Sequence, residues 1–242
     1  MADLLFYQKP VPLDSRIHKD LRLTSRQNGF GFASATNSVI LTGTEFVEAA
    51  KEYPILFVRA GTRIVPVAIL GLRDSENLFV QEDGSWQARY IPAFVRRYPF
   101  VLAGDETAAQ LVVCIDADYP GFVTSNEEGH PLFDAKGGAT DWLKKATQFL
   151  QEYQAQVRRT ETFVNRLNGL DLFVEQTVRA DLGEGKQLTM PGLLVVNEKK
   201  LLELSKPQAL ELFRCGELSW VYAHLASLSN MARLVDLLAR RT

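Results

Sequence analysis

Residues 53–61 read YPILFVRAG, and residues 98–104 read YPFVLAG. Both stretches follow a short helical pattern, open an apolar, β-branched run and reach a turn at Ala-Gly. Proline disfavours helical geometry at the residue before it, so each Tyr-Pro pair is expected to end a helix and start a strand. Each copy therefore predicts a helix, a strand and a turn in the same order.

The similarity continues beyond the turns. A second apolar run follows each copy, and a Phe-Val step follows that run, at residues 79–80 and at residues 122–123. The offset is 45 residues at the Tyr-Pro pairs and 43 residues at the Phe-Val steps, which suits a repeated supersecondary unit. We interpret residues 53–123 as an internal repeat, with chance similarity between two short stretches as the alternative.

Length and composition are ordinary for a globular protein. The chain has 242 residues, of which 46% are hydrophobic and 23% charged, so it suffices for one large domain or two smaller ones. A net charge of -2 argues against a nucleic-acid partner, because binding to phosphates depends on an excess of positive charge.

The sequence predicts no membrane span, since no apolar stretch reaches about eighteen residues. The N-terminal stretch lacks the basic and apolar regions of a secretion signal, so we expect a cytoplasmic location. The cysteines, Cys114 and Cys215, lie far apart in different predicted elements and imply no disulfide framework. Cys114 lies in an apolar run and is expected to be a small buried side chain.

The first part of the chain reads as mainly β. Thr42 and Glu45 have the spacing of a capping box and predict a short helix after them. Pro66 indicates an edge position or a bulge in its strand, and Asp83-Gly84 indicates a tight hairpin turn. Strands are expected at residues 4–7, 29–32, 55–58, 64–70, 78–81, 100–102, 110–116 and 122–124, with another short helix at 91–97.

The pattern changes after Gly137-Gly138. Apolar residues then recur every three or four positions from 140 to 167, which predicts one long amphipathic helix. Its length of about 42 Å at 1.5 Å per residue exceeds what a small sheet needs, so we expect it to kink or to project toward a partner. A hairpin (172–179 and 186–196, around a turn at 181–185), two short helices (198–204 and 207–214) and a last helix (218–238) are expected to follow.

These elements predict an α+β fold. Residues 1–139 are expected to form a mainly antiparallel β part with short helices. Residues 140–242 are expected to form a mainly helical part with one hairpin that covers the β layer. The two parts are either separate domains or a single integrated domain.

The sequence offers no recognisable reaction centre. Its three histidines, His18, His130 and His224, are dispersed without the spacing of metal ligands. Asp116 and Asp118 lie two residues apart, but a solvated turn explains them better than a calcium loop. There is no G-x-S-x-G nucleophile motif. We therefore expect no metal, no cofactor and, on balance, no enzyme.

The candidate ligand-binding residues form two pairs, one on the last helix and one on the short helix at 91–97. Trp220 and His224 lie four residues apart beside the apolar stripe of the last helix, where they would line a pocket or join two elements by hydrogen bonds. A structural histidine is the favoured interpretation. Arg96 and Arg97 would hold an anionic ligand or, as is more common, extend their charged ends into solvent.

Several stretches resemble the bacterial SapC family. They are VPVAILGL at 65–72, NLFV at 77–80, YIPAFVRRYPF at 90–100, FLQEY at 149–153 and YAHLASLSN at 222–230. The resemblance extends over nearly the whole chain, and the block at 90–100 is the most specific part of it.

The resemblance implies little about chemistry. The family is named for an association with bacterial surface layers, whereas many members look intracellular, and its motifs carry no catalytic residues. We expect a non-enzymatic interaction or accessory protein of the SapC type that takes part in an assembly, through a protein partner or self-association. This expectation rests on the missing catalytic motifs, the 14 Phe and 7 Tyr residues and a helix longer than its sheet requires. The alternatives are a small-molecule-binding protein or enzyme with a pocket near Arg96, Trp220 and His224, and a surface-layer component. The identity of any ligand or partner and the oligomeric state are left open.

Overall fold

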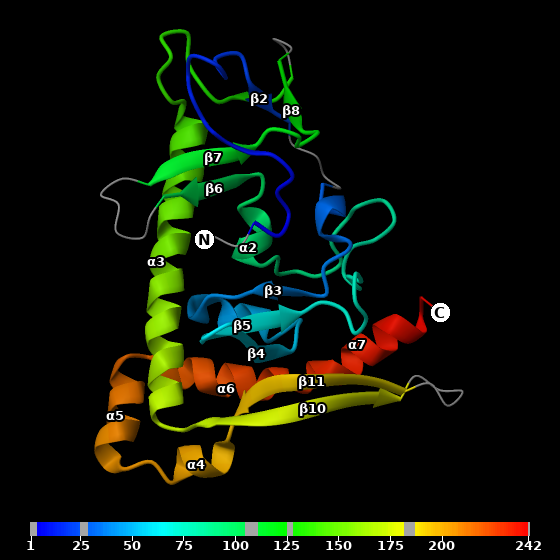
Figure 1. The fold of residues 1–242 in the computed structure, drawn as a ribbon, viewed down its shortest axis with the longest axis vertical. Coiled ribbons are helices and arrows are strands. Elements are labelled where there is room, and N and C mark those ends of the chain that lie inside the picture. Colours follow the sequence, from blue (N-terminus) through cyan, green and yellow to red (C-terminus); the bar gives the residue numbers. More distant parts are fainter. Residues whose placement is uncertain (1–3, 25–28, 105–110, 125–127, 182–186, 242) are drawn as a thin grey trace.

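The computed structural model describes residues 4–24, 29–104, 111–124, 128–181 and 187–241. Within these residues every strand pairing is antiparallel, and the sheets are accompanied by one long helix and a group of C-terminal helices (Figure 1). The α+β prediction is confirmed. No helix in the described ranges is long and apolar enough to cross a membrane.

The largest sheet has five strands in the order β10-β11-β4-β5-β3. Its centre is the β4–β5 hairpin, and its edges are the long strand β10 and the short strand β3. The strands are β3 (Ser38–Ile40), β4 (Ile55–Ala60), β5 (Arg63–Ile69), β10 (Phe173–Asp181) and β11 (Gln187–Val196). The β10–β11 hairpin agrees with the prediction, and the turn predicted at 181–185 lies mostly outside the described residues.

Two three-stranded sheets, β1-β7-β6 and β8-β2-β9, complete the described β structure. Prolines at both ends of β1 are tolerated because this strand is at an edge. The strands are β1 (Pro10–Pro12), β2 (Arg22–Leu23), β6 (Phe100–Ala103), β7 (Val112–Asp116), β8 (Phe122–Val123) and β9 (His130–Pro131).

The helices begin where the sequence supplies caps. The predicted capping box of Thr42 and Glu45 is present, and Thr140 caps the long helix by accepting a hydrogen bond from the Leu143 N–H at 3.3 Å. The helices are α1 (Phe46–Ala49), α2 (Ala93–Arg96), α3 (Asp141–Gly169), α4 (Glu198–Leu202), α5 (Lys206–Arg214), α6 (Glu217–Ser227) and α7 (Asn230–Ala239), with 3-10 helices η1 (Gly31–Ala33) and η2 (Gly43–Glu45).

The length of α3 is explained by two hydrophobic cores. Leu143 and Leu150 belong to the core beside β6 and β7, whereas Phe163 and Leu167 belong to the core of the five-stranded sheet. A helix of 29 residues is about 43 Å long, and it runs beside both sheets (Figure 1). The helix therefore does not project from the fold as expected, because each half packs one face into a core of the same chain.

The repeated unit is present as far as its second strand. Each Tyr-Pro pair follows a short helix and leads into an antiparallel hairpin, β4–β5 in one copy and β6–β7 in the other. The copies then diverge. Val80 forms only an isolated bridge with Trp86, whereas β8 pairs with β2 in another sheet. The Tyr98–Pro99 peptide is cis.

Two strands expected near the N-terminus are not found. Residues 4–7 form a turn closed by the Tyr7 N–H and the Leu4 carbonyl, and Gly31–Ala33 is a 3-10 helix instead of an edge strand. In both places the aromatic rings explain the apolar pattern, because Phe6 and Phe32 pack against each other at 5.0 Å and not on a sheet.

Pro66 is not at an edge, since β5 lies between β4 and β3. Its carbonyl accepts the Leu41 N–H just beyond the end of β3, and in a strand the nitrogen faces the same side. The missing N–H therefore forgoes only a return bond to Leu41, beyond the end of β3, and leaves the pairing of β5 with β4 intact.

The predicted last helix is two helices, α6 and α7, separated at Leu228 and Ser229. Ser227 and Ser229 bond to the carbonyls three residues before them, a type of contact that bends helices. Past the break, Asn230 donates to the Ala50 carbonyl at 2.7 Å and fixes the start of α7. At its end Arg241 donates to the carbonyls of Asn77, Leu78 and Val80.

The predicted boundary at residue 139 passes through shared structure. The five-stranded sheet combines β3–β5 with β10–β11, and its core includes side chains from both sides of that position. The two predicted parts are thus joined by strand pairing as well as by α3.

Candidate functional site

One face of the five-stranded sheet is covered, and the other is partly open near the turn of the β4–β5 hairpin. Phe57 faces the covered side, where its ring contacts Phe163 and His224. Side chains alternate along a strand, so Val58 on β4 faces the opposite side, and strand pairing places Val65 beside it. Both valines are half-buried, although they lie on central strands.

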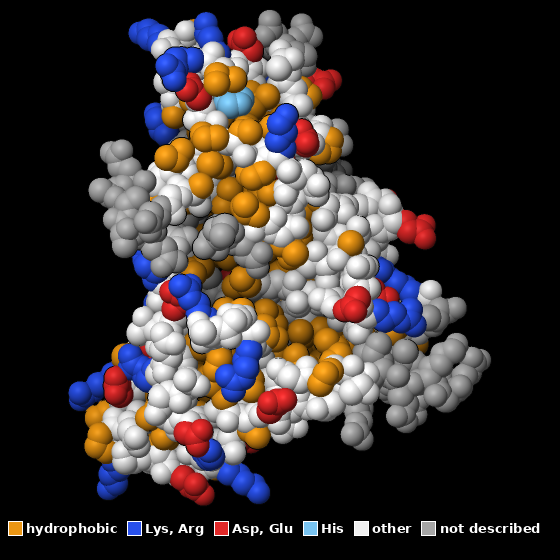
Figure 2. Space-filling model, viewed as in Figure 1, with side chains coloured by type: hydrophobic (Ala, Val, Ile, Leu, Met, Phe, Trp, Pro, Cys, Tyr) orange, Lys and Arg blue, Asp and Glu red, His pale blue; other side chains and the backbone are white. Residues whose placement is uncertain are grey.

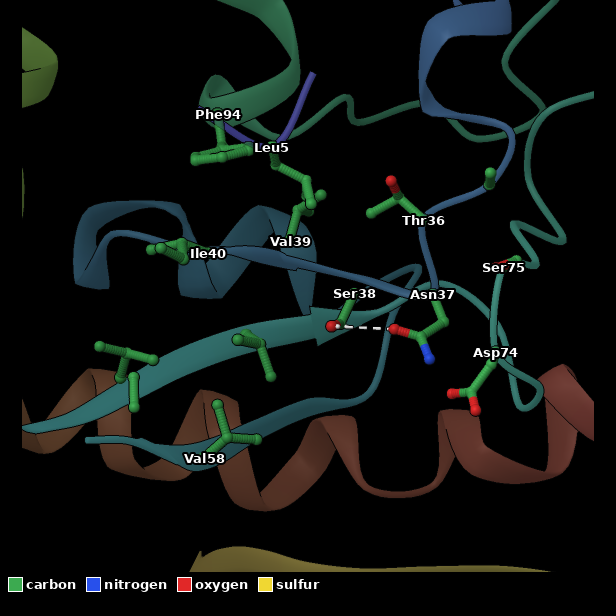
Figure 3. A pocket seen from close by; sticks show the side chains of 14 residues that line it. Leu5, Thr36, Asn37, Ser38, Val39, Ile40, Val58, Asp74, Ser75 and Phe94 are labelled. Atoms are coloured by element: carbon green, nitrogen blue, oxygen red, sulfur yellow. Dashed lines mark hydrogen bonds between the residues drawn. The ribbon is translucent and has the colours of Figure 1, made fainter. Parts of the chain in front are cut away.

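The open face forms the floor of a groove, which we call the β3 groove. Its volume is about 470 Å³. Figure 2 shows hydrophobic side chains in a hollow at mid-height of this face of the molecule. Leu5 and Phe94 form a wall opposite β3 (Figure 3). The principal apolar lining residues are Leu5, Ile40, Val58, Val65, Val67 and Phe94.

The other end of the β3 groove is polar. Its lining residues there are Thr36, Asn37, Ser38, Asp74 and Ser75 (Figure 3). The Ser38 hydroxyl donates to the Asn37 side-chain oxygen at 3.2 Å. Asp74 is the charged residue of the lining, and its neighbour Arg73 pairs with Glu76 at 3.8 Å. The groove therefore combines an apolar floor with one negatively charged end.

The edge strand β3 also has backbone groups that point away from the rest of the sheet. The Asn37 carbonyl and the Leu41 N–H bond to β5, so the residues between them alternate in the direction of their backbone groups. Val39 faces β5, and Ser38 and Ile40 face away from it. Among the described residues we find no hydrogen-bond partner for the N–H and C=O groups of Ser38 and Ile40.

The predicted site residue His224 joins two strands. Leu194 of β11 pairs with Phe57 of β4, and the same register two residues along places Val196 opposite Ile55. There the imidazole lies between the strands: the Val196 N–H donates to Nε2 at 3.1 Å, and Nδ1–H donates to the Ile55 carbonyl at 2.7 Å. This is the structural role that the sequence favoured for His224.

Burial keeps His224 neutral. Its side chain is fully buried, and burial lowers its pKa to about 4, while the hydrogen bond to Ile55 acts in the opposite direction. Ser227, one turn later, accepts the Ile55 N–H at 2.9 Å. Both polar groups of Ile55 are thus bound by side chains of α6.

The other predicted site residues make separate internal contacts. Trp220 packs on Phe163 at 5.2 Å and under the Arg159 guanidinium at 4.7 Å. The Arg96 guanidinium lies 5.1 Å from the Phe149 ring, and Arg97 is buried over the rings of Phe94 and Tyr153.

The helix α3 shows how far Arg96 lies from Trp220, because each of them packs on a different part of it. Phe149, beneath Arg96, and Phe163, beneath Trp220, are fourteen residues apart on the helix, or about 21 Å. The structure does not bring the four predicted residues together, and none of them lines the β3 groove.

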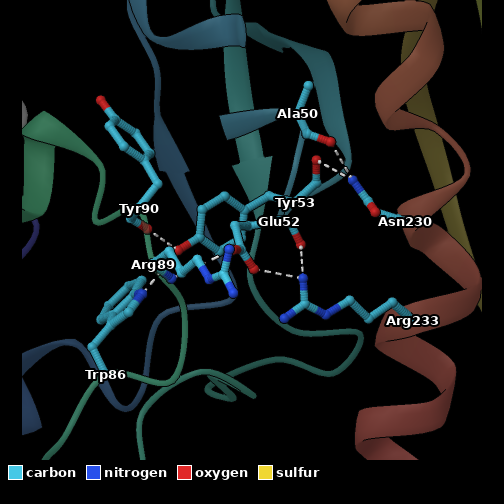
Figure 4. A network of polar contacts seen from close by, with 8 residues as sticks. All are labelled: Ala50, Glu52, Tyr53, Trp86, Arg89, Tyr90, Asn230 and Arg233. Atoms are coloured by element: carbon cyan, nitrogen blue, oxygen red, sulfur yellow. Dashed lines mark hydrogen bonds and ion pairs between the residues drawn. The ribbon is translucent and has the colours of Figure 1, made fainter. Parts of the chain in front are cut away.

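A polar network at the start of α7 is also structural (Figure 4). Glu52 pairs with Arg233 at 2.6 Å, and the Arg89 N–H donates to the same carboxylate. The Tyr53 hydroxyl accepts from the Trp86 indole at 2.8 Å and donates to the Tyr90 carbonyl. These groups hold α7 and the loop before α2 against the end of α1.

Asp116 is not a solvated turn residue, as the sequence suggested, because it is fully buried. Burial opposes its ionisation, but hydrogen bonds from the N–H groups of Gln8 and Lys9 and from the Tyr98 hydroxyl hold its pKa below the ordinary value. Across the described ranges, no cluster of His, Cys, Asp and Glu has the arrangement of a metal site. Cys114 is buried, and burial raises the pKa of its thiol.

Sequence reasoning missed the β3 groove as a site. Its lining comes from segments around residues 5, 36–40, 58–67, 74–75 and 94, which no local motif connects. One signal was present: Val58 and Val65 are apolar residues within a hairpin whose alternate positions face two sides.

The comparisons with known proteins give one match. Residues 13–234 match the model of the SapC family. No curated protein and no solved structure matches the chain.

Proposed function

The chain belongs to the SapC family, and from that premise we propose that it is a non-enzymatic interaction or accessory protein that binds a protein partner through the β3 groove. The observation that carries this proposal is the partly exposed apolar surface of the β4–β5 hairpin in the five-stranded sheet. Val58 and Val65 are only half-buried on the two central strands of the sheet, and Leu5 in the opposite wall of the groove is 50% exposed. Covering such side chains stabilises a complex in proportion to the apolar area removed from water.

The test is capture from native lysate of the source cells with two matched variants. Val65→Lys places a charge on the groove floor, whereas Val47→Lys makes the same change at an exposed valine of α1 that does not line the groove. We expect wild type and Val47→Lys to capture the same proteins, and Val65→Lys to lose them. Identical capture by all three would contradict the proposal, provided circular dichroism shows all three folded.

Self-association is the second form of the same proposal. Light scattering after size-exclusion chromatography measures the oligomeric state of the same three proteins. If wild type and Val47→Lys form an oligomer and only Val65→Lys is a monomer, the partner is a second copy of the chain. A partner protein is supported if all three are monomers and capture depends on Val65.

A small-molecule-binding protein or enzyme is the alternative. The volume of the β3 groove, about 470 Å³, lies within the range of ligand pockets. The version of this alternative with a pocket at Arg96, Arg97, Trp220 and His224 has less support, because these residues contact different parts of α3 and β4. A small metabolite that co-purifies with wild type and is lost in Val65→Lys would favour the alternative.

The place of action is also a proposal. We propose the cytoplasm, where an accessory protein would meet an enzyme, with a surface layer as the alternative that the family name suggests. Fractionation of the source cells distinguishes the two. Recovery in the cell-surface fraction would favour the surface layer.

A further inference from the structure

We propose that the β3 groove takes an extended segment of a partner protein that carries apolar side chains at alternate positions and one basic residue. The inference rests on the proposed function and names the chemistry of its partner. It depends on three properties of the groove, namely its backbone edge, its floor and its charge.

The backbone edge favours an extended chain. Ser38 and Ile40 each direct one N–H and one C=O away from β5, and both residues line the groove. An extended peptide beside an edge strand forms hydrogen bonds with such groups. The two N–H and two C=O groups of Ser38 and Ile40 are spaced along the strand, so a compact ligand would match them less well than an extended chain.

The floor selects the side chains. Ile40, Val65 and Val67 line it from neighbouring strands, with Val67 paired to Ile40. Successive side chains of an extended segment paired with β3 point to opposite faces of the sheet, so every second residue would lie on the same face as Ile40 and Val67, next to Ile40. A segment of about five residues spans about 16 Å at 3.3 Å per residue, similar to the five residues of β5 from Val65 to Ile69.

The charge selects the basic residue. The lining contains the carboxylate of Asp74 and no Lys, Arg or His. Asp74 is exposed, and no ion pair engages it in the described part of the chain. A Lys or Arg side chain of the segment would complement this end of the groove, next to the polar groups of Asn37 and Ser75.

Fluorescence anisotropy with a synthetic probe tests the proposal. The probe is the labelled peptide Lys-Thr-Val-Thr-Val with blocked ends. The comparison peptides replace Lys by Glu, or carry N-methyl groups at alternate backbone nitrogens. We expect saturable binding of the Lys peptide and about fivefold or greater weakening with Glu. Each N-methyl group that removes a hydrogen bond between the peptide backbone and β3 should weaken binding about two- to tenfold.

Protein variants locate the site. Asp74→Asn should weaken the Lys peptide about two- to fivefold, as for one exposed ion pair. Asp20→Asn, at an exposed aspartate outside the groove, should have no effect. Leu5→Ser should weaken all apolar peptides, whereas Leu4→Ser, at the adjacent exposed leucine, should not. These substitutions are at exposed positions, so they provide a test even if Val65→Lys does not fold.

The outcomes separate this inference from the proposed function. Equal binding of the Lys and Glu peptides, indifference to N-methylation, or equally effective competition by a simple alkylamine would overturn the inference. If lysate capture still depends on Val65 in that case, the proposed function stands and only the extended segment is wrong. If capture is also independent of Val65, both are wrong.

Discussion

Acidification is expected to break the bridge that His224 makes between β4 and β11. The neutral ring accepts the Val196 N–H and donates to the Ile55 carbonyl, and a protonated ring has no acceptor left. The folded pKa is about 4, below the value of about 6.5 for an unfolded chain. A depressed histidine pKa means that the unfolded state binds more protons in this window, so stability is fully present above about pH 6.5 and falls as the pH drops toward 4.

The size of the effect follows from the shift. Each unit of pKa difference corresponds to about 1.4 kcal/mol, so His224 should remove about 3 kcal/mol of unfolding free energy between about pH 7 and about pH 4. Its complete burial means that little solvent screening reduces this value. Acidic groups also titrate in this range, so a reference protein is needed.

The reference is His224→Gln. A glutamine amide can supply an acceptor oxygen and an NH₂ donor in place of the acceptor and donor nitrogens of the neutral imidazole, but it does not titrate. Urea unfolding at about pH 7 and about pH 4 gives the loss of unfolding free energy for wild type and for the variant. Wild type should lose about 3 kcal/mol more than the variant. A difference below about 1 kcal/mol would show that His224 does not bridge the strands as a neutral group.

Two further substitutions test a close packing contact at Gly43 and the buried hydrogen bonds of Asp116. In Gly43→Ala the new Cβ would lie 2.3 Å from the Trp220 ring, so overpacking should cost about 1–3 kcal/mol in urea unfolding. Gly31→Ala, where nothing lies within 4 Å, is the control, and equal costs would refute the close approach. Asp116→Asn leaves one acceptor oxygen for the donors that now share the carboxylate, and should cost about 1–3 kcal/mol. Amide exchange at Gln8 and Lys9 should quicken in that variant, and unchanged exchange would show that Asp116 does not anchor them.

Local signals in the sequence predicted the local structure well. The capping box of Thr42 and Glu45 and the amphipathic stripe before Asn168-Gly169 are complete within a few residues or turns, and both elements are present. The helix break at Ser229 was missed because α6 and α7 both bury apolar side chains on one side, so the stripe continues across the bend. Only the hydrogen bonds of the serines and of Asn230 show the break.

The candidate site depends on pairing between distant segments, which periodicity does not encode. His224 was recognised as a polar residue beside an apolar stripe, but its partners Ile55 and Val196 lie on strands far away in the chain. Asp116 looked like a turn residue because its donors are near the N-terminus. The β3 groove required the sheet order as well, since that order decides that Ser38 and Ile40 lie at an edge.

Backbone amide exchange with and without the captured partner tests the role of the β3 groove most directly. The account predicts slower exchange at Ser38 and Ile40, whose N–H groups point away from β5. The Val39 amide, which faces β5, should change little. Protection elsewhere on the molecule, with Ser38 and Ile40 unchanged, would contradict the account.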